Sequence, residues 1–329
     1  GIADENATAT TISLTSDLNV TANFESLTYP LNLSAEPSGG GTVVGSGRYV
    51  LGSSVNIVAL PTTGYQFIGW IGGNPADANN MIDMATRCLL VENGDRLILV
   101  DAGMGSKQSD KFFSYYYRWG EQELVSSIKR AGFSCDDITD VFFTHLHFDH
   151  CGGGTTRDKS GSFFRPLFKR AKYWSNKNHW LWAKAPNARE RASFLNENLS
   201  PIESSGALSY VSQHSKGFEY KKELGFDVLF VDGHTEKQMI PKISYQNKSL
   251  VFAADLIPTL GHVPVPYIMG YDIRPLVSMS EKDLFLKEAV EKNYHLFLEH
   301  DAHNEIITLK NTEKGVRVDK IFTFNELFN

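Results

Sequence analysis

Three histidines and one aspartate occupy six consecutive positions, His145-Leu146-His147-Phe148-Asp149-His150. The stretch follows a short apolar run at residues 138–144, which indicates a buried strand. Burying so many polar side chains is costly unless something binds them, and neutral imidazole and carboxylate suit Zn²⁺. Four donors this close cannot all reach one ion. The spacing therefore favours two metals roughly 3.5–4 Å apart on one loop, and a chance surface cluster is the alternative.

Three later polar residues repeat one pattern, in which a potential ligand follows an apolar run. His234 comes after the run at 226–231, Asp255 after 250–254, and His300 after 295–298. Binding groups collected from strand ends are the expected construction of a site in an α/β protein. Each residue alone is more typical of a satisfied core or loop group. Together with the first cluster they complete a ligand shell.

The chain beyond residue 74 alternates predicted strands and helices, which favours α/β layers. Asn93-Gly94-Asp95 joins apolar runs at 88–92 and 96–101 and predicts a hairpin. The spacing of apolar residues predicts helices at 122–131, 176–185, 188–198 and 281–292, and further strands at 138–144, 226–231, 239–245, 250–254 and 295–298.

This set of residues resembles the metallo-β-lactamase superfamily, whose pattern is His-x-His-x-Asp-His followed by His, Asp and His. The resemblance covers roughly residues 85–305 and implies a four-layer αββα sandwich. It also implies two divalent metal ions, Zn²⁺ first, with Fe, Mn or Co as alternatives. Carried over residue by residue, the first metal takes His145, His147 and His234, the second takes Asp149, His150 and His300, and Asp255 bridges both. Asp101 matches an aspartate that supports the metal loop, and a turn cap is its alternative role.

The metals define the chemistry that we expect. A hydroxide between two metals is a nucleophile at neutral pH because metal binding lowers the pKa of water to ~7. It would attack a carbonyl or phosphoryl centre, with Asp149 as a candidate proton carrier. Tyr267 and Tyr271 are candidate hydrogen-bond donors to the developing oxyanion.

The subclass rests on resemblance. Residues 145–153, 255–259 and 266–272 are similar to the quorum-quenching lactonase branch, which opens N-acyl homoserine lactones. A small-molecule lactone or ester is therefore the expected substrate, with phosphoester, phosphotriester or thioester hydrolysis as the alternative. A bridging Asp255 disfavours true β-lactamases and His147 disfavours diiron oxygen reductases, whereas mono-iron sulfur dioxygenases stay open.

Aromatic residues are dense at 112–119 and at 163–182. One interpretation is an apolar pocket for an acyl chain. The other is core packing or the surface of a homodimer.

Residues 1–73 form a predicted β domain ahead of a hydrolase domain at 74–329. The first 80 residues hold one basic residue, Arg48, against six acidic ones, and all ten histidines lie at or after position 145. Such a shift marks a domain boundary. Period-two alternation predicts strands at 11–14, 19–24, 31–35 and 54–59, with turns at 37–41 and 45–47.

Residues 14–24, 36–43 and 64–70 resemble the divergent internalin B-type repeat of bacterial surface proteins, in a different order along the chain. One small unit could close with residues 11–24 beside 64–70. The segment is then either an adhesion or spacing module or an inert appendage. A surface-binding repeat protein with a residual metal site is the rival function. The repeat stands where the family opens with its own strand pair, so the hydrolase sheet either lacks an edge or borrows the repeat strands.

Charge and cysteine content exclude several classes. The net charge of −6 and the lack of a Lys/Arg run argue against nucleic acid. The sequence has no run of 18 apolar residues, so we expect no membrane span. No signal peptide is visible at the N-terminus of this sequence. We expect a cytoplasmic hydrolase part, with export open because of the repeat. The three cysteines, Cys88, Cys135 and Cys151, do not form a disulfide framework.

Overall fold

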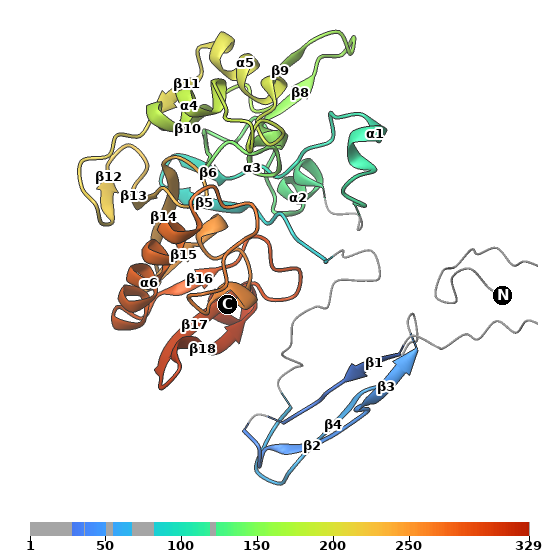
Figure 1. Cartoon of the computed structure of the whole chain (residues 1–329). Helices are drawn as coiled ribbons and strands as arrows, with labels where there is room; N and C mark the ends of the chain where they lie inside the picture. The colour runs from blue at the N-terminus through green and yellow to red at the C-terminus, as the bar shows by residue number, and fades with distance from the viewer. Residues whose placement is uncertain (1–27, 36, 51–54, 68–81, 119–122, 329) are drawn as a thin grey trace, which may run out of the picture. The chain divides into compact units, whose positions relative to one another are not determined.

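The computed structural model describes residues 28–35, 37–50, 55–67, 82–118 and 123–328 (Figure 1). The chain divides into two compact units, Gly1–Ile82 and Asp83–Asn329. The strands predicted at 11–14 and 19–24, their pairing with residues 64–70, and the join expected near Gly73 lie outside the described residues.

The described residues of the first unit form two antiparallel strand pairs. Strand β1 (Thr28–Leu31) pairs with β3 (Gly47–Val50), and β2 (Gly41–Val44) pairs with β4 (Val58–Pro61). The strand predicted at 31–35 is wrong beyond Leu31, because the Leu33 amide donates to the Ser46 hydroxyl at 3.0 Å instead of joining a ladder. The strand predicted at 54–59 begins only at Val58. The Gly40 amide donates to the Pro37 carbonyl at 2.8 Å, which confirms a turn there.

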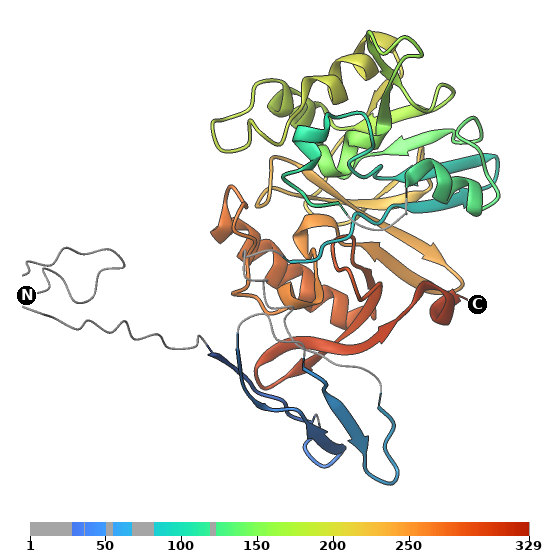
Figure 2. The ribbon, with the colours of Figure 1, turned by 90° about the vertical axis from the view of Figure 1, so that its right-hand side faces the viewer.

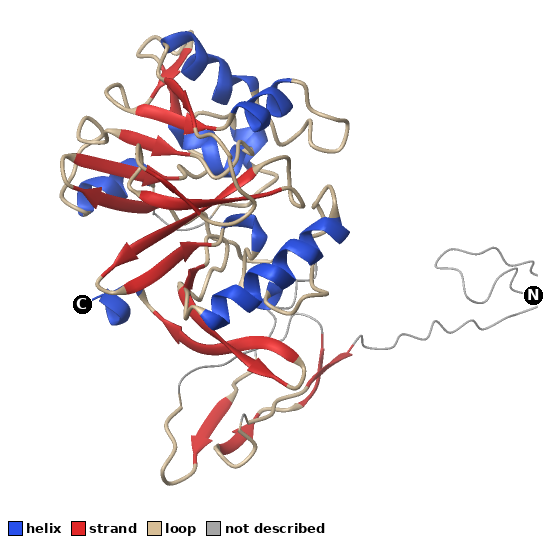
Figure 3. Ribbon diagram, turned by 90° about the vertical axis from the view of Figure 1, so that its left-hand side faces the viewer, coloured by secondary structure: helices blue, strands red, loops and turns tan. Residues whose placement is uncertain are grey.

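The second unit contains two large sheets (Figures 2 and 3). The five-stranded sheet has the order β11-β10-β7-β6-β5, built from β5 (Leu89–Asn93), β6 (Arg96–Val100), β7 (Asp140–Phe142), β10 (Lys172–Ser175) and β11 (Leu208–Tyr210). The seven-stranded sheet runs in chain order through β12 (Glu219–Lys221), β13 (Phe226–Val231), β14 (Gln238–Tyr245), β15 (Lys248–Phe252), β16 (His295–Phe297), β17 (Ile306–Thr312) and β18 (Gly315–Phe322). Strands β8 (Thr155–Arg157) and β9 (Phe164–Pro166) form a separate hairpin.

The helices lie on the outer faces of the paired sheets (Figure 3). They are α1 (Asp110–Phe113), α2 (Leu124–Arg130), α3 (Phe148–Cys151), α4 (Lys177–Lys184), α5 (Asn196–Ser205), α6 (Pro275–Glu291) and α7 (Phe324–Phe328). Short 3₁₀ turns occur at η1 (Gly152–Gly154), η2 (Ala254–Leu256) and η3 (Leu260–His262). None of the described helices is long and apolar enough to cross a membrane.

The alternation of side chains in β6 shows how the layers form. Leu97 and Leu99 join a buried cluster with Trp180 of α4 and Ile202 of α5. The alternate residues, Ile98 and Val100, enter a second cluster that includes residues of β13, β14 and α6. Because successive strand side chains point to opposite faces, one sheet packs against helices on one side and the other sheet on its second side. The four-layer αββα architecture is thus confirmed.

Most predicted elements of this unit are confirmed, and one helix is wrong. The hairpin forms at Gly94, which has a φ of +62°. Residues 188–193 make turns instead of the predicted helix at 188–198, and α5 starts only at Asn196. The side chain of Asn187 accepts from the amides of Arg189 and Glu190, and the Ser193 carbonyl accepts from the Phe148 amide. These local and tertiary bonds replace a helical ladder.

Strand β5 is the end of the five-stranded sheet. Among the described strands, β1 to β4 pair only with one another, so none of them extends this sheet. Residues 1–27 and 68–81 lie outside the described residues, so a missing sheet edge and an edge borrowed from the repeat both stay predictions.

Candidate metal centre

The first ligand candidates lie where β7 ends. His145 follows the strand, His147 is the N-cap of α3, and Asp149 and His150 belong to its single turn. The turn is followed by glycines in η1, and a Cβ on Gly153 would collide with the Ala102 carbonyl. Close approach of two backbones therefore requires glycine directly behind the cluster.

The other candidates come from the seven-stranded sheet. His234 follows β13, Asp255 lies in η2 after β15, and His300 follows β16. Both oxygens of Glu281, on α6, accept backbone amides just before His234, those of Asp232 at 2.8 Å and Gly233 at 2.9 Å. The turns after neighbouring strands thus converge on one end of the sandwich.

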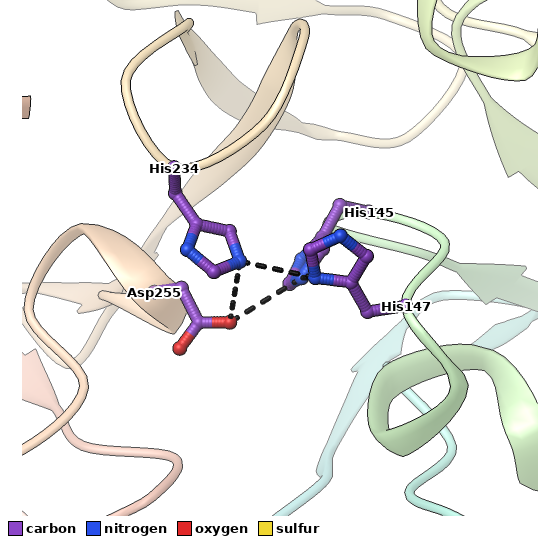
Figure 4. A group of neighbouring side chains, drawn as sticks. All are labelled: His145, His147, His234 and Asp255. Carbon is purple, nitrogen blue, oxygen red and sulfur yellow. Dashed lines mark hydrogen bonds and ion pairs between the residues drawn. The ribbon is translucent and has the colours of Figure 1, made fainter. Parts of the chain in front are cut away.

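Four side chains form the first group, His145, His147, His234 and Asp255 (Figure 4). Nδ1 of His147 lies 3.0 Å from His145 Nε2 and 3.1 Å from His234 Nε2. Oδ2 of Asp255 lies 3.3 Å from His145 Nε2 and 3.2 Å from His234 Nε2. All four residues are buried.

Asp149, His150 and His300 form a second group beside the first. Nε2 of His150 is 3.1 Å from His300 Nε2 and 3.9 Å from an Asp149 oxygen. The Asp255 carboxylate lies between the groups, with Oδ2 3.0 Å from His150 Nε2 and Oδ1 3.2 Å from His300 Nε2. The structure therefore brings all seven predicted ligand side chains together.

The donor set fits divalent metal ions. Zinc–ligand bonds of about 2.0–2.1 Å give tetrahedral edges of about 3.3 Å, close to the separations within the first group. Oδ1 of Asp255 is buried and faces His300 Nε2 at 3.2 Å without forming a hydrogen bond of good geometry with the described residues. A buried carboxylate oxygen without a donor is costly, and a cation would satisfy it.

The second ring nitrogen of each candidate histidine also has a partner. His150 Nδ1 meets Asp101 Oδ2 at 3.0 Å, and His234 Nδ1 meets Asp272 Oδ1 at 2.9 Å. Thr144 Oγ1 is 3.1 Å from His145 Nδ1, and the Ala85 carbonyl is 2.8 Å from His300 Nδ1. The remaining nitrogen, His147 Nε2, lies 3.4 Å from Glu190. Such partners fix the tautomer and aim the free nitrogen at a metal.

Sequence reasoning identified Asp101 but missed Glu190, Asp272 and Glu299. Glu190 lies in the predicted helix at 188–198, and Asp272 directly follows Tyr271, a candidate hydrogen-bond donor. Glu299 is fully buried, 3.2 Å from His150 Nδ1, and its position directly before His300 was the one available signal. These carboxylates reach the site through tertiary contacts, so no local spacing marks them.

Burial and mutual proximity shift the ionisation of these groups. Burial, together with the neighbouring His150 and His147, holds the pKa of His145 well below its usual range. Although burial opposes it, the imidazoles of His234 and His300 hold the pKa of Asp255 well below normal. Although burial opposes it, nearby carboxylates, chiefly Glu299 for His150 and Asp255 for His234 and His300, raise the pKa values of these three imidazoles. A metal would therefore displace protons from these rings when it binds.

The two predicted tyrosines differ in position. The Tyr271 ring centroid lies 6.5 Å from that of His234, and although the residue is 55% exposed, partial burial and the charge of Asp255 raise the pKa of its phenol. Tyr267 is 62% exposed, and its hydroxyl makes no hydrogen bond with the described residues. Of the two, only Tyr271 lies beside the cluster.

The two aromatic stretches lie in different environments. Phe168, Tyr173 and Trp180 are buried in the core, which confirms core packing for residues 163–182 in this part. In the other stretch, Phe112 and Tyr116 pack on Phe148, with ring centroids 5.4 and 5.0 Å apart. Phe148 stands between the ligand candidates His147 and Asp149 in the chain, so these rings form an aromatic patch next to the cluster.

Comparison with known protein families gives two matches. Residues 82–156 match the metallo-beta-lactamase superfamily, and residues 31–88 match the divergent InlB B-repeat domain. The repeat resemblance of the first unit is therefore confirmed.

Several relatives are similar over most of the second unit. An N-acyl homoserine lactonase of Bacillus cereus is 25% identical over 69% of this chain and 85% of its own length. An N-acyl homoserine lactonase of a Bacillus species is 30% identical over 68% of this chain and 84% of its own. The solved structure of AidC, a dizinc quorum-quenching lactonase in complex with a product, is 25% identical and has a TM-score of 0.59, covering 75% of this chain and 83% of AidC.

Proposed function

The chain belongs to the metallo-β-lactamase superfamily and is a metal-dependent hydrolase, and on this premise we propose that it opens the ring of an N-acyl homoserine lactone at a dinuclear centre. The observation that carries the proposal is the position of Asp255 between two groups of ligand candidates. Support for the substrate comes from relatives that are N-acyl homoserine lactonases.

The residues divide between two ions in this proposal. His145, His147 and His234 would hold one metal, Asp149, His150 and His300 would hold the other, and Asp255 would be shared by both. When bound, such ions, Zn²⁺ first, lower the pKa of water and polarise a substrate carbonyl. The dizinc character of AidC supports this metal and this number.

Hydrolysis adds water to the lactone carbonyl and breaks the ring C–O bond, so a proton must reach the leaving alkoxide. Asp149 is the least buried ligand candidate, with a side chain 25% exposed, and it is suited to carry that proton. Partial burial and the charge of Asp255 raise the pKa of Tyr271, so its phenol keeps its proton and can donate a hydrogen bond to a developing oxyanion.

The aromatic patch of Phe112, Tyr116 and Phe148 gives the acyl chain an apolar surface. Each buried methylene contributes about 0.8 kcal/mol, so a longer acyl chain should lower KM. Phe112→Ala should weaken this dependence on chain length, because it removes one ring and leaves the ligand candidates untouched.

The test is metal content by plasma emission together with ring opening of acyl homoserine lactones before and after chelation. We expect about two equivalents of metal and ring opening that chelation abolishes and zinc restores. His147→Ala should remove activity, whereas His214→Ala, an exposed histidine outside the cluster, should not. Metal-loaded protein that cleaves phosphoesters or thioesters but no lactone contradicts the proposed substrate.

A further inference from the structure

His262 lies in a segment that is tied to the end of the metal cluster. The amide of His300 donates to the Pro258 carbonyl at 3.2 Å, and the Leu260 amide donates to the Asp301 carboxylate at 2.9 Å. This segment, residues 255–262, begins at Asp255 in η2 and ends at His262, the last residue of η3. The chain between Asp255 and His262 is therefore held to the ligand candidate His300 and to its neighbour Asp301.

Two neighbours hold His262 in place. Oγ1 of Thr259 lies 2.8 Å from His262 Nδ1. Lys282, almost fully buried on α6, donates to the His262 carbonyl at 3.0 Å and to those of Pro264 and Tyr267 at 3.1 and 2.6 Å. The three protons of one ammonium thus fix the backbone around the ring.

Burial favours the neutral form of the His262 ring, which lies within electrostatic range of Asp255 and His300. Burial and the nearby Lys282 ammonium lower the pKa of His262, and the charges of Asp255 and His300 also act on it. A neutral imidazole carries one proton. If the Thr259 hydroxyl donates to Nδ1, that proton is on Nε2.

Nε2 of His262 has no hydrogen-bond partner among the described residues, and the side chain is half-buried. An imidazole that is oriented through one nitrogen, has its other nitrogen unpaired among the described residues, and lies within electrostatic range of Asp255 and His300 is suited to meet a ligand at this centre.

We propose that His262 is a catalytic residue whose Nε2–H donates a hydrogen bond to the substrate oxygen on which negative charge develops, and that Thr259 positions it. The inference rests on the proposed function and deepens it. Thr259 acts through the imidazole only, since its hydroxyl bonds to no other described residue. Lys282 is a positioning residue for the same segment.

The test compares wild type with His262→Ala, Thr259→Val and the double variant. Each purified protein is assayed for kcat, KM and bound metal. His262→Ala should lower kcat by about 100-fold or more, the loss typical of one oxyanion donor, with KM and metal content unchanged. Thr259→Val should lower kcat by a smaller factor. It should cause no further loss in the His262→Ala background, because a positioning residue has nothing left to position.

His214→Ala is the matched control for removing a loop imidazole, and it should keep the wild-type kcat. Wild-type kcat in His262→Ala, loss of metal from that variant, or additive losses in the double variant overturns the role of His262. None of these results would contradict lactone hydrolysis itself.

A wrong substrate proposal would give a different set of results. If wild type cleaves another ester or a phosphoester but no lactone, the same variants are compared on that substrate, and an unchanged kcat again overturns the inference. A metal-loaded wild type that hydrolyses none of these substrates overturns both proposals.

Discussion

Glu190 illustrates how a candidate ligand is fixed by a residue that no motif marks. Its carboxylate accepts from Thr235 Oγ1 at 2.5 Å, Trp182 Nε1 at 2.8 Å and Asn187 Nδ2 at 2.5 Å, and faces His147 Nε2. Four groups from different segments therefore meet one buried acid. Such an arrangement holds the imidazole in one orientation even before a metal binds.

We expect Glu190→Gln to weaken metal binding about 10–100-fold, because the amide cannot accept as strongly from the imidazole and presents a donor to its neighbours. Competition with a chromophoric chelator measures the affinity. Glu203→Gln is the matched control, since Glu203 bonds to Trp180 and Lys184 at a more exposed position. Equal affinities for the two variants would show that Glu190 does not support the site.

Cys151 directly follows the metal motif, and its thiol could either line the site or pack in the core. In the structure it is fully buried, and its thiol donates to the Leu146 carbonyl at 3.3 Å. It belongs to the cluster of core residues beneath the five-stranded sheet. Cys151 is therefore a buried core residue that packs behind the metal loop.

The Cys151 thiol should resist alkylation in the native protein. Burial raises its pKa to about 12, so at pH 8 only about one thiol in 10⁴ is ionised, and thiolate is the reactive form. Iodoacetamide labelling followed by peptide mass spectrometry measures this, with labelling in denaturant as the reference. Rapid native labelling of Cys151, at the rate seen for the partly exposed Cys135, would contradict the packing.

At the residue scale, the sequence predicted the members of the cluster but not their supports. His145 to His150 share one turn, and His234, Asp255 and His300 each follow an apolar run, so local pattern was enough to group them. Their service as ligands stays a prediction. Asp272 and Glu190 could not be found, because hydrogen bonds across long sequence separations leave no periodic trace.

Among the elements, strands with a continuous apolar run were the easiest to predict. β13 has the predicted bounds, Phe226–Val231, because both of its faces pack into the core. The predicted helix at 188–198 failed because Asn187 and Ser193 bond to other partners than a helical ladder. β2 and β3 were missed because each opens with a glycine and holds only four residues, too short for a clear alternation.

The turn η1 (Gly152–Gly154) sets the distance between the metal loop and the end of β6. A methyl group on Gly153 would meet the Ala102 carbonyl, and the Gly153 amide already donates to Gly103 at 2.9 Å. We expect Gly153→Ala to destabilise the protein by about 1–3 kcal/mol or more, since neither backbone can move without disturbing the cluster.

Thermal unfolding and metal content measure this effect together. Gly217→Ala is the control, because a Cβ there meets nothing within 4 Å. We expect its unfolding temperature to stay near wild type. A Gly153→Ala protein with wild-type stability and metal content would mean that the backbone contact behind the cluster is looser than the structure indicates.

For the whole molecule, the composition shift predicted two parts, and the chain does divide into two compact units. The boundary predicted at 73/74 remains a prediction, because residues 68–81 lie outside the described residues. The candidate metal centre belongs to the second unit alone, because every ligand candidate lies between positions 145 and 300.

A protein that starts at Asp83 should therefore fold, bind metal and hydrolyse its substrate. Every described strand of the two large sheets comes from the second unit, and β1 to β4 pair only among themselves. Residues 84–87 must be kept, because the amides of Ala85 and Arg87 donate to the carbonyls of His300 and Glu299 at 3.1 Å. The full chain is the reference for kcat, KM, metal content and unfolding temperature.

The outcome also discriminates between the two interpretations of the repeat. Equal kcat and KM in the shortened protein would assign the repeat to adhesion, spacing or no role in catalysis. A raised KM with unchanged metal content would mean that the repeat contributes to the substrate pocket. Loss of both metal and stability would contradict our prediction, because the hydrolase sheets would then depend on the first unit despite the separate pairing of their strands.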